Sequence, residues 1–237
     1  PCEKRALFEL VKLSQCTLEN AIIITTDCLG RMENKEYLDL IKTNPDITEQ
    51  FLKENTFHEK ITSSCKVCTE FTSNTSDIHV NTLGCHEHIT FSPHTDRGKE
   101  ILETLHCERT DASKTRDAEI KELLRHRTEN LDALTENVLS DIKDMGTFQK
   151  MIGSCLNCYN CRTACPVCYC KECVFLTDIF SHMPETLLNR ADKKGIIKLP
   201  TDTTMFHMTR LAHMSHACVG CGQCSSVCPS DIPVADI

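Results

Sequence analysis

The sequence predicts an α/β domain over residues 1–110, a helical connector over 111–149 and an α-helical module over 150–237. Three observations support this prediction. Helical and extended segments alternate over the first 110 residues, which is typical of an α/β unit. A highly charged stretch with regularly spaced apolar residues follows, as in an amphipathic helix. The last part is rich in cysteine, with seven of the eighteen cysteines of the chain between Cys155 and Cys173.

The elements of the α/β domain are predicted from apolar spacing and from turn residues. Apolar residues three and four apart predict helices over 1–15, 31–44, 47–57 and 95–109. Pro45 ends the second of these helices, because the residue before a proline is disfavoured in helical conformation. The run NAIIITTDCLG at 20–30 predicts a buried, parallel strand followed by a turn. Two further strands are predicted over 75–81 and 88–93.

Composition argues against several classes of protein. The net charge of −8 argues against a nucleic-acid-binding protein, because such proteins rely on Lys and Arg to contact phosphates. No apolar run approaches the roughly 20 residues of a transmembrane helix, so we expect no membrane span. No secretory signal pattern is present. We therefore expect a cytoplasmic protein with reduced thiols, in which the cysteines bind metal or clusters instead of forming disulfides.

Two cysteine runs with the same spacing carry the strongest signal. Each has the form Cys-x2-Cys-x2-Cys-x3-Cys-Pro, and they begin at Cys155 and Cys218. In two-cluster ferredoxins such a run gives three ligands to one [4Fe-4S] cluster and its last cysteine to the other. The prediction is a ferredoxin-like module with a first cysteine set of Cys155, Cys158, Cys161 and Cys228, and a second set of Cys218, Cys221, Cys224 and Cys165. Structural zinc sites, the alternative, usually use two separated Cys-x2-Cys pairs.

Spacing alone leaves the other candidate ligands open. An extra triplet, Cys168, Cys170 and Cys173, could hold a fourth cluster or another metal, or it could pack passively beside the clusters. In the α/β domain, Cys65-x2-Cys68 could join Cys2 and Cys28 in one cluster site if the strand ends meet at one edge of the sheet.

Three charged or titratable side chains near these motifs are further candidates. Lys66, between two cysteines, could offset cluster charge or bind a cofactor, or it could be solvated. Arg97 begins a predicted helix, whose N–H groups could bind an anion. His207, which precedes the second run together with His213 and His216, could tune or ligate a cluster, or it could pack beside one.

Taken together, these pieces resemble a known family. The stretches PCEKRALFEL, TTDCLG, CKVCTEFTSNTSDIHVNTLG and HTDRGKEILETL are similar to the beta-subunit family of coenzyme F420 hydrogenases and F420-dependent dehydrogenases. The stretches CLNCYNCRTACPVCYCKEC and HMSHACVGCGQCSSVCPSDIPVA resemble most the beta subunits of methanogen-type, F420-dependent formate dehydrogenase. The resemblance covers nearly the whole chain. Two residues depart from the family. Leu29 lies in the stretch DCLG, where the family usually has DCPG or FCSG, and Asn81 stands where the family often has Gly.

The resemblance implies a flavoprotein complex of methanogenesis with FAD, F420 and iron–sulfur clusters. It implies that the α/β domain holds a cluster on a third cysteine set of Cys2, Cys28, Cys65 and Cys68. Single electrons would pass between a flavin site and a partner subunit. The implied partners are a catalytic dehydrogenase or hydrogenase subunit, a heterodisulfide-reductase-like complex, or both.

Two other functions stay open at this point. The chain could be a flavin-free, ferredoxin-like adaptor that connects two redox enzymes and handles no substrate itself. It could also be a structural zinc protein. Iron–sulfur clusters would separate the first two functions from the third by their brown colour.

Overall fold

The computed structural model describes residues 1–53, 58–85, 88–110, 114–177, 184–195 and 201–237. The elements are, in chain order, α1 (Cys2–Lys12), β1 (Ile24–Thr26), α2 (Asn34–Thr43), α3 (Ile47–Lys53), the 3-10 turn η1 (His58–Lys60), α4 (Ser63–Lys66), β2 (Ile78–Asn81), β3 (Thr90–Pro93), α5 (Asp96–Thr104), α6 (Lys114–Asp141), α7 (Met145–Met151), α8 (Asn160–Thr163), the 3-10 turn η2 (Val174–Leu176), α9 (Pro184–Lys194), α10 (Thr201–Met214) and α11 (Gln223–Ser226).

The N-terminal part combines helices with a three-stranded sheet of order β1-β2-β3. β1 pairs with β2 in parallel, and β2 pairs with β3 in antiparallel orientation. The parallel pair requires a long crossover, which carries α2, α3 and α4. All three strands lie within the segments that the sequence predicts. Thr95 caps α5, because its side-chain oxygen accepts a hydrogen bond from the Gly98 N–H.

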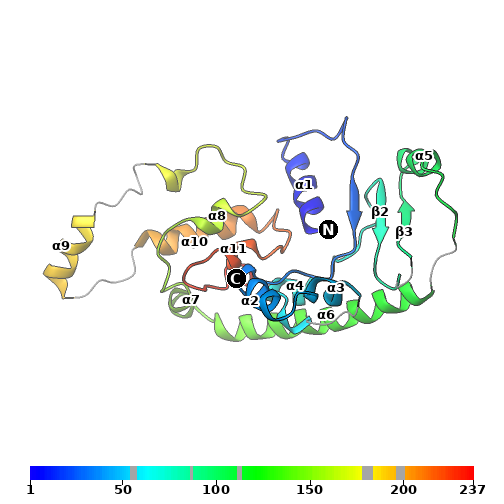
Figure 1. Cartoon of the computed structure of the whole chain (residues 1–237). Coiled ribbons are helices and arrows are strands. Elements are labelled where there is room, and N and C mark those ends of the chain that lie inside the picture. The colour runs from blue at the N-terminus through cyan, green and yellow to red at the C-terminus, as the bar shows by residue number, and fades with distance from the viewer. Residues whose placement is uncertain (54–57, 86–87, 111–113, 178–183, 196–200) are drawn as a thin grey trace.

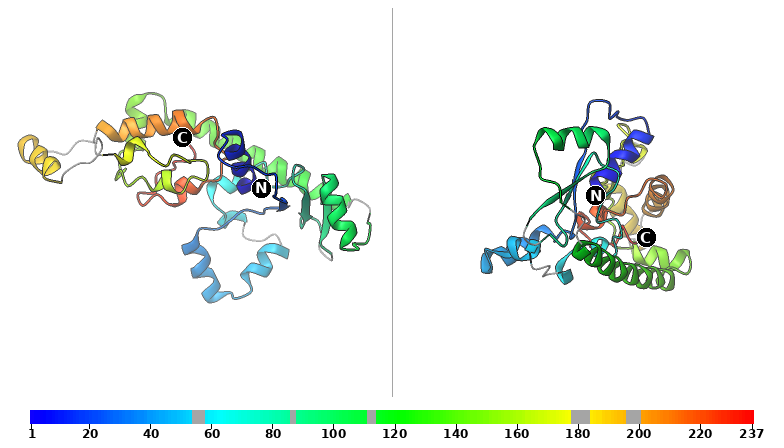
Figure 2. Two further views of the ribbon diagram at one scale, coloured as in Figure 1. Left: turned by 90° about the horizontal axis from the view of Figure 1, so that it is seen from above. Right: turned by 90° about the vertical axis from the view of Figure 1, so that its right-hand side faces the viewer.

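The prediction that the run at 20–30 is buried was wrong for its isoleucines, although Asp27 and Leu29 are buried. Ile24 is 61% exposed and Ile22 is 47% exposed, whereas Thr25 is buried. β1 is an edge strand, and α2 and α3 project away from the sheet in the view from above (Figure 2). The crossover helices therefore leave the isoleucine face of β1 uncovered. The buried face holds Thr25, whose hydroxyl lies 2.7 Å from Ser76 Oγ and 2.8 Å from His79 Nδ1.

α6 and α1 connect the sheet to the cysteine-rich module. α6 runs beneath both parts, and α1 lies between them (Figure 1, Figure 2). Ile120 and Leu123 of α6 pack against a core of Leu29, Phe71 and Leu83. Ala6 of α1 packs with Val167 and Val219 of the module. The connector predicted over 111–149 contains α6, and its predicted end falls inside α7.

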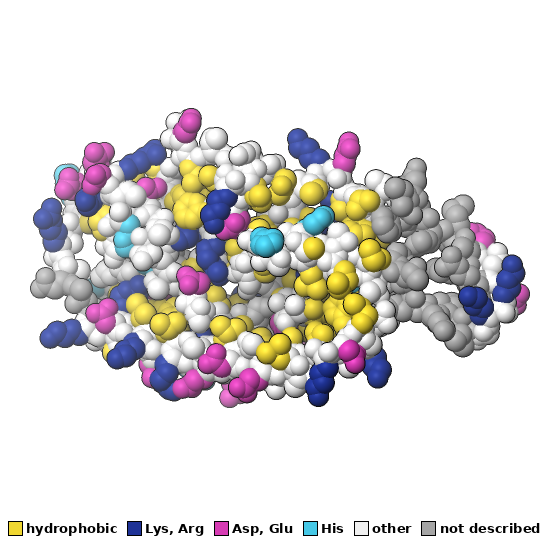
Figure 3. Space-filling model, turned by 180° about the vertical axis from the view of Figure 1, so that it is seen from behind, with side chains coloured by type: hydrophobic (Ala, Val, Ile, Leu, Met, Phe, Trp, Pro, Cys, Tyr) yellow, Lys and Arg dark blue, Asp and Glu magenta, His cyan; other side chains and the backbone are white. Residues whose placement is uncertain are grey.

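The module has its own core around aromatic side chains. The core consists of Cys161, Phe175, Phe206, Ile232 and Val234. Phe175 and Phe206 meet edge to face, with ring centroids 4.9 Å apart. On the face opposite to Figure 1, hydrophobic side chains gather toward this module, while many charged ones lie along the rim (Figure 3). None of the helices that the structure describes combines the length and the apolar character needed to cross a membrane.

Candidate metal centres

The two cysteine runs fold into matching loops. Asn157 and Tyr159 have φ of 51° and 59°, and Gly220 and Gly222, at the equivalent positions of the second run, have φ of 62° and 73°. In both loops the second of these residues caps a four-residue helix, α8 or α11. Left-handed residues turn successive backbone N–H groups toward one side, which makes an anion-binding concavity. The repeated spacing in the sequence is therefore a repeat in backbone shape.

The first cysteine set lines one pocket. Cys155, Cys158 and Cys161 enter it from the first loop, and Cys228 enters it from the end of the second run. The walls are mainly apolar and include Phe206, Ile232 and Val234. Burial raises the pKa of the Cys161 thiol to about 11, although Arg210 opposes the shift. A bound metal ion would deprotonate such a thiol, so four convergent thiols in an apolar pocket fit a cluster site.

The second cysteine set lies where α1 meets the module. Cys165 and Cys221 pack on the core that contains Ala6. Burial raises the pKa of the Cys224 thiol to about 11, with Arg210 lowering it and the thiolates of Cys221, Cys165 and Cys218 raising it. Cys224 is therefore within electrostatic reach of the other three members of the set. These buried thiols also fit a cluster site.

The third cysteine set gathers at the end of β1. Cys28 follows this strand, Cys65 lies on α4, and Cys2 begins α1. Burial raises the pKa of the Cys28 thiol, and the thiolates of Cys65 and Cys2 raise it further. A Cβ on Gly30 would lie only 3.1 Å from Cβ of Cys65, so the turn after β1 and α4 are in close contact. The fold thus brings together cysteines that spacing alone could not connect.

Cys68, the fourth member of this set, is contacted by two arginines that sequence analysis missed. Arg5 Nη2 lies 4.0 Å from Cys68 Sγ. Arg127 of α6 donates to the carbonyl oxygens of Cys68 and Leu29, at 3.1 and 2.9 Å. The sequence does contain a signal for Arg127, because it stands in the apolar stripe of α6 between Leu123 and Leu131.

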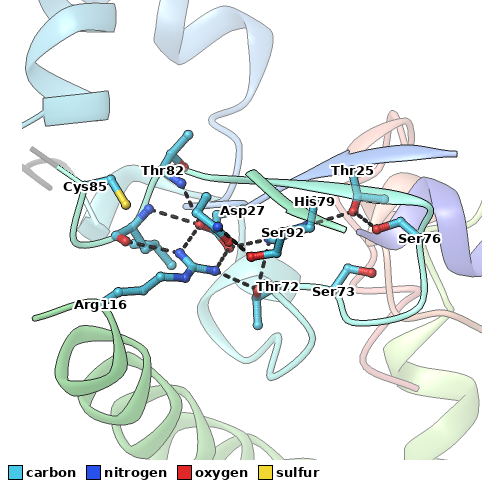
Figure 4. A network of polar contacts seen from close by, with 12 residues as sticks. Thr25, Asp27, Thr72, Ser73, Ser76, His79, Thr82, Cys85, Ser92 and Arg116 are labelled. Atoms are coloured by element: carbon cyan, nitrogen blue, oxygen red, sulfur yellow. Dashed lines mark hydrogen bonds and ion pairs between the residues drawn. The ribbon is translucent and has the colours of Figure 1, made fainter. Parts of the chain in front are cut away.

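A buried polar network holds the backbone next to Cys28 (Figure 4). Asp27 Oδ1 lies 2.9 Å from His79 Nε2, and its carboxylate also accepts hydrogen bonds from Arg116 and from the N–H groups of Thr82 and Leu83. Burial opposes ionisation of Asp27, but these hydrogen bonds outweigh it and hold the pKa of the carboxyl well below its usual value. The satisfied carboxylate fixes the turn that presents the Cys28 thiol.

Arg162 lies beside two members of the extra triplet, Cys168 and Cys170. Arg162 Nη2 donates to the carbonyl oxygen of Cys170 at 3.1 Å. Burial raises the pKa of the Cys168 thiol, Arg162 lowers it, and the thiolates of Cys170 and Cys173 raise it. Cys173 packs on the module core, whereas Cys170 is exposed. Metal binding by this triplet stays a prediction.

The other candidate residues lie in different surroundings. His207 is fully buried, with Nε2 3.4 Å from Cys155 Sγ, and burial together with Arg210 lowers its pKa to about 4. Lys66 is half-buried on α4. Arg97 donates to the carbonyl oxygen of Ala21 at 3.0 Å. Cofactor binding by Lys66 and Arg97 stays a prediction.

Among the described residues, no group of three or more His, Cys, Asp or Glu side chains is arranged to hold a metal ion. Thiolates bound to one Zn²⁺ stand about 3.8 Å apart, since each Zn–S bond is about 2.3 Å long and the geometry is tetrahedral. The four thiolates of a [4Fe-4S] cluster bind four different irons, so they stand farther apart than thiolates that bind a single zinc ion.

Comparison with known proteins supplies independent evidence. A family model described as a 4Fe-4S dicluster domain matches residues 167–233, which include the second cysteine run and the extra triplet. The F420-dependent formate dehydrogenase subunit beta of Methanocaldococcus jannaschii is 25% identical over 275 residues, covering all of this chain and 67% of the relative. The F420-dependent formate dehydrogenase 1 subunit beta of Methanococcus maripaludis is also 25% identical, over 277 residues, with the same coverage.

The comparisons confirm the resemblance to F420-dependent formate dehydrogenase beta subunits. These relatives are subunits of an oxidoreductase, and their similarity extends over the α/β part as well as the cysteine-rich module. The dicluster match supports iron–sulfur clusters in the module.

Proposed function

We propose that this chain is an iron–sulfur electron-transfer subunit of an F420-dependent formate dehydrogenase complex. In this proposal it relays single electrons between a flavin site and a catalytic partner subunit. The cytoplasm is the proposed compartment. The observation that carries the proposal is that each of the three cysteine sets lies next to another, so that together they form a series through the molecule.

Contacts between the sets support a relay in the order third, second, first. The Cys2 and Cys221 thiolates interact electrostatically. Cys68 and Cys218 line the same groove beside α6. A Cβ on Gly222 would lie 2.5 Å from Ser64 Oγ, so the second loop packs directly on α4. The second set therefore stands between the other two.

The second and first sets also lie close enough to interact electrostatically. The thiolate of Cys224 raises the pKa of Cys161, and Arg210 acts on both thiols. α8 and α11, which follow the two loops, pack against each other. This arrangement suits a pair of centres that exchange cysteine ligands, as in two-cluster ferredoxins.

The residues of this chain would supply the ligands and control the surroundings. Bound [4Fe-4S] clusters supply one-electron transfer, with potentials set by burial, nearby charge and hydrogen bonds to sulfur. The three cysteine sets would hold three clusters, and the extra triplet would hold a fourth if it binds one. Apolar side chains such as Phe206 and Ile232 line the pocket of the first set.

The proposed flavin and partners are inferred from the relatives' names and from the family resemblance. The relatives' names specify F420 and formate dehydrogenase. FAD, a formate-oxidising or hydrogenase catalytic subunit, and a heterodisulfide-reductase-like complex follow from the resemblance. Lys66 and Arg97 are the proposed cofactor contacts within this chain.

The variant Cys221→Ala tests the relay. We expect loss of the second cluster, because Cys221 is one of its four proposed ligands, and loss of electron transfer between formate and F420 in the assembled complex. Iron content and coupled turnover measure the two effects. Cys107→Ala is the matched control, because Cys107 is exposed and outside all the proposed sets. Coupled turnover at the wild-type rate in Cys221→Ala would rule out the relay.

A further inference from the structure

Arg127 is a fully buried cation at the third cysteine set. Only 2% of its surface is exposed, although it lies on α6 among charged residues that face solvent. Its Nη1 and Nη2 atoms donate to the carbonyl oxygens of Cys68 and Leu29, and its Cζ lies 4.9 Å from the ring centre of Phe71. Burying a guanidinium is costly unless its charge is balanced.

The groups nearest to Arg127 that can carry negative charge are cysteine thiols. Burial lowers the pKa of Arg127, and the thiolates of Cys68, Cys28 and Cys65 raise it. Within the described part of the chain, no carboxylate forms an ion pair with Arg127. Its two carbonyl partners satisfy N–H groups but are neutral. The third cysteine set, with what it binds, is therefore the source of balancing charge that lies next to Arg127.

We propose that Arg127 is a fixed, buried counter-charge of the third cluster site. This inference rests on the proposed function, because it takes the third set to hold a cluster. The two donated hydrogen bonds position the turn after β1 and the Cys65–Cys68 loop relative to each other. The positive charge raises the reduction potential of the cluster, since a reduced cluster is more negative and gains more from a nearby cation.

The same helix offers a matched control. Arg125 is exposed and pairs with Glu122 and Glu129 on the surface of α6. Its removal takes away one positive charge at nearly the same sequence position but in solvent, where screening weakens the effect. Arg125→Met therefore separates a local effect of Arg127 from a general change in charge.

The experiment is a redox titration followed by electron paramagnetic resonance, on the anaerobically purified full chain. The variants are Arg127→Met, Arg127→Lys and Arg125→Met, and the signal missing from Cys28→Ala identifies the third cluster. In Arg127→Met we expect the midpoint potential of that cluster to fall by at least 59 mV. For one electron, this shift equals a tenfold change in the ratio of oxidised to reduced cluster at a given potential. The other two clusters keep their potentials, and Arg125→Met changes none.

The outcomes separate the charge from the geometry. A wild-type potential in a fully loaded Arg127→Met chain would overturn the proposal. If Arg127→Met fails to load the third cluster, loading of Arg127→Lys supports the counter-charge, and failure of both variants would overturn it in favour of a purely structural arginine. A wild-type chain with about 8 iron atoms would instead refute the third cluster itself, and with it that part of the proposed function.

Discussion

At the scale of single residues, guanidinium groups accompany every group of cysteines. Arg127 and Arg5 lie at the third set, Arg210 acts on the first and second sets, and Arg162 lies at the extra triplet. Arg210 is anchored by a hydrogen bond of 3.1 Å to the carbonyl oxygen of Val234. Arginine stays protonated at any ordinary pH, so these cations are a permanent part of the surroundings of each set.

His207 provides a prediction at this scale. The variant His207→Leu removes the contact between Nε2 and Cys155 Sγ, which are 3.4 Å apart. Because hydrogen bonds to sulfur stabilise the more negative, reduced cluster, we expect the midpoint potential of the first cluster to become more negative. A potentiometric titration measures the shift. His213→Leu, on the same helix but exposed, is the control, and equal potentials in the two variants would contradict the prediction.

At the scale of elements, the second cysteine loop and α4 are held in register. Arg31 and Glu33 hydrogen-bond to Ser226 of α11, and Gly222 packs on Ser64 of α4. The loop between β1 and α2 is therefore tied to α11, the helix that carries Cys224 of the second set. These contacts fix the third set next to the second without any covalent link.

The glycines of the second loop test this packing. Gly220 and Gly222 both have positive φ, but an added Cβ meets nothing within 4 Å at Gly220 and lies 2.5 Å from Ser64 Oγ at Gly222. We expect Gly220→Ala to lower the free energy of unfolding by about 1–3 kcal/mol, the cost of the strained backbone. Gly222→Ala should cost more, because α4 must also move away. Thermal unfolding of the loaded protein measures both.

A compensating change makes the glycine test specific. Ser64→Gly removes the side chain that the new Cβ would meet, so in that background Gly222→Ala should cost about as much as Gly220→Ala. Equal losses for the two alanine variants in the unchanged chain would contradict direct packing of the loop on α4.

At the scale of the whole molecule, the predictable features are the local ones. The cysteine runs were recognisable because ligands three and four residues apart belong to one loop, and the structure repeats the loop shape at Tyr159 and Gly222. The three strands were recognisable from short apolar or β-branched runs between turn residues. These signals need no knowledge of distant parts of the chain.

The remaining features depend on topology. Cys2, Cys28 and Cys65 meet because β1 ends where α1 and α4 begin, which no spacing rule specifies. Arg127 is 59 residues from Cys68, and an arginine in a charged helix gives only a weak signal. The exposure of Ile24 was missed because an apolar run does not show whether its crossover helices cover the sheet.

The central claim is that three cysteine sets hold three clusters in one continuous relay. The most direct test is the number of iron, acid-labile sulfide and flavin groups per chain in anaerobically purified native protein. The account predicts about 12 iron and 12 sulfide atoms, and about 16 if the extra triplet also holds a cluster. One flavin per chain would place the flavin site here, whereas none would favour the adaptor. About 8 iron atoms, or zinc in place of iron, would contradict the relay.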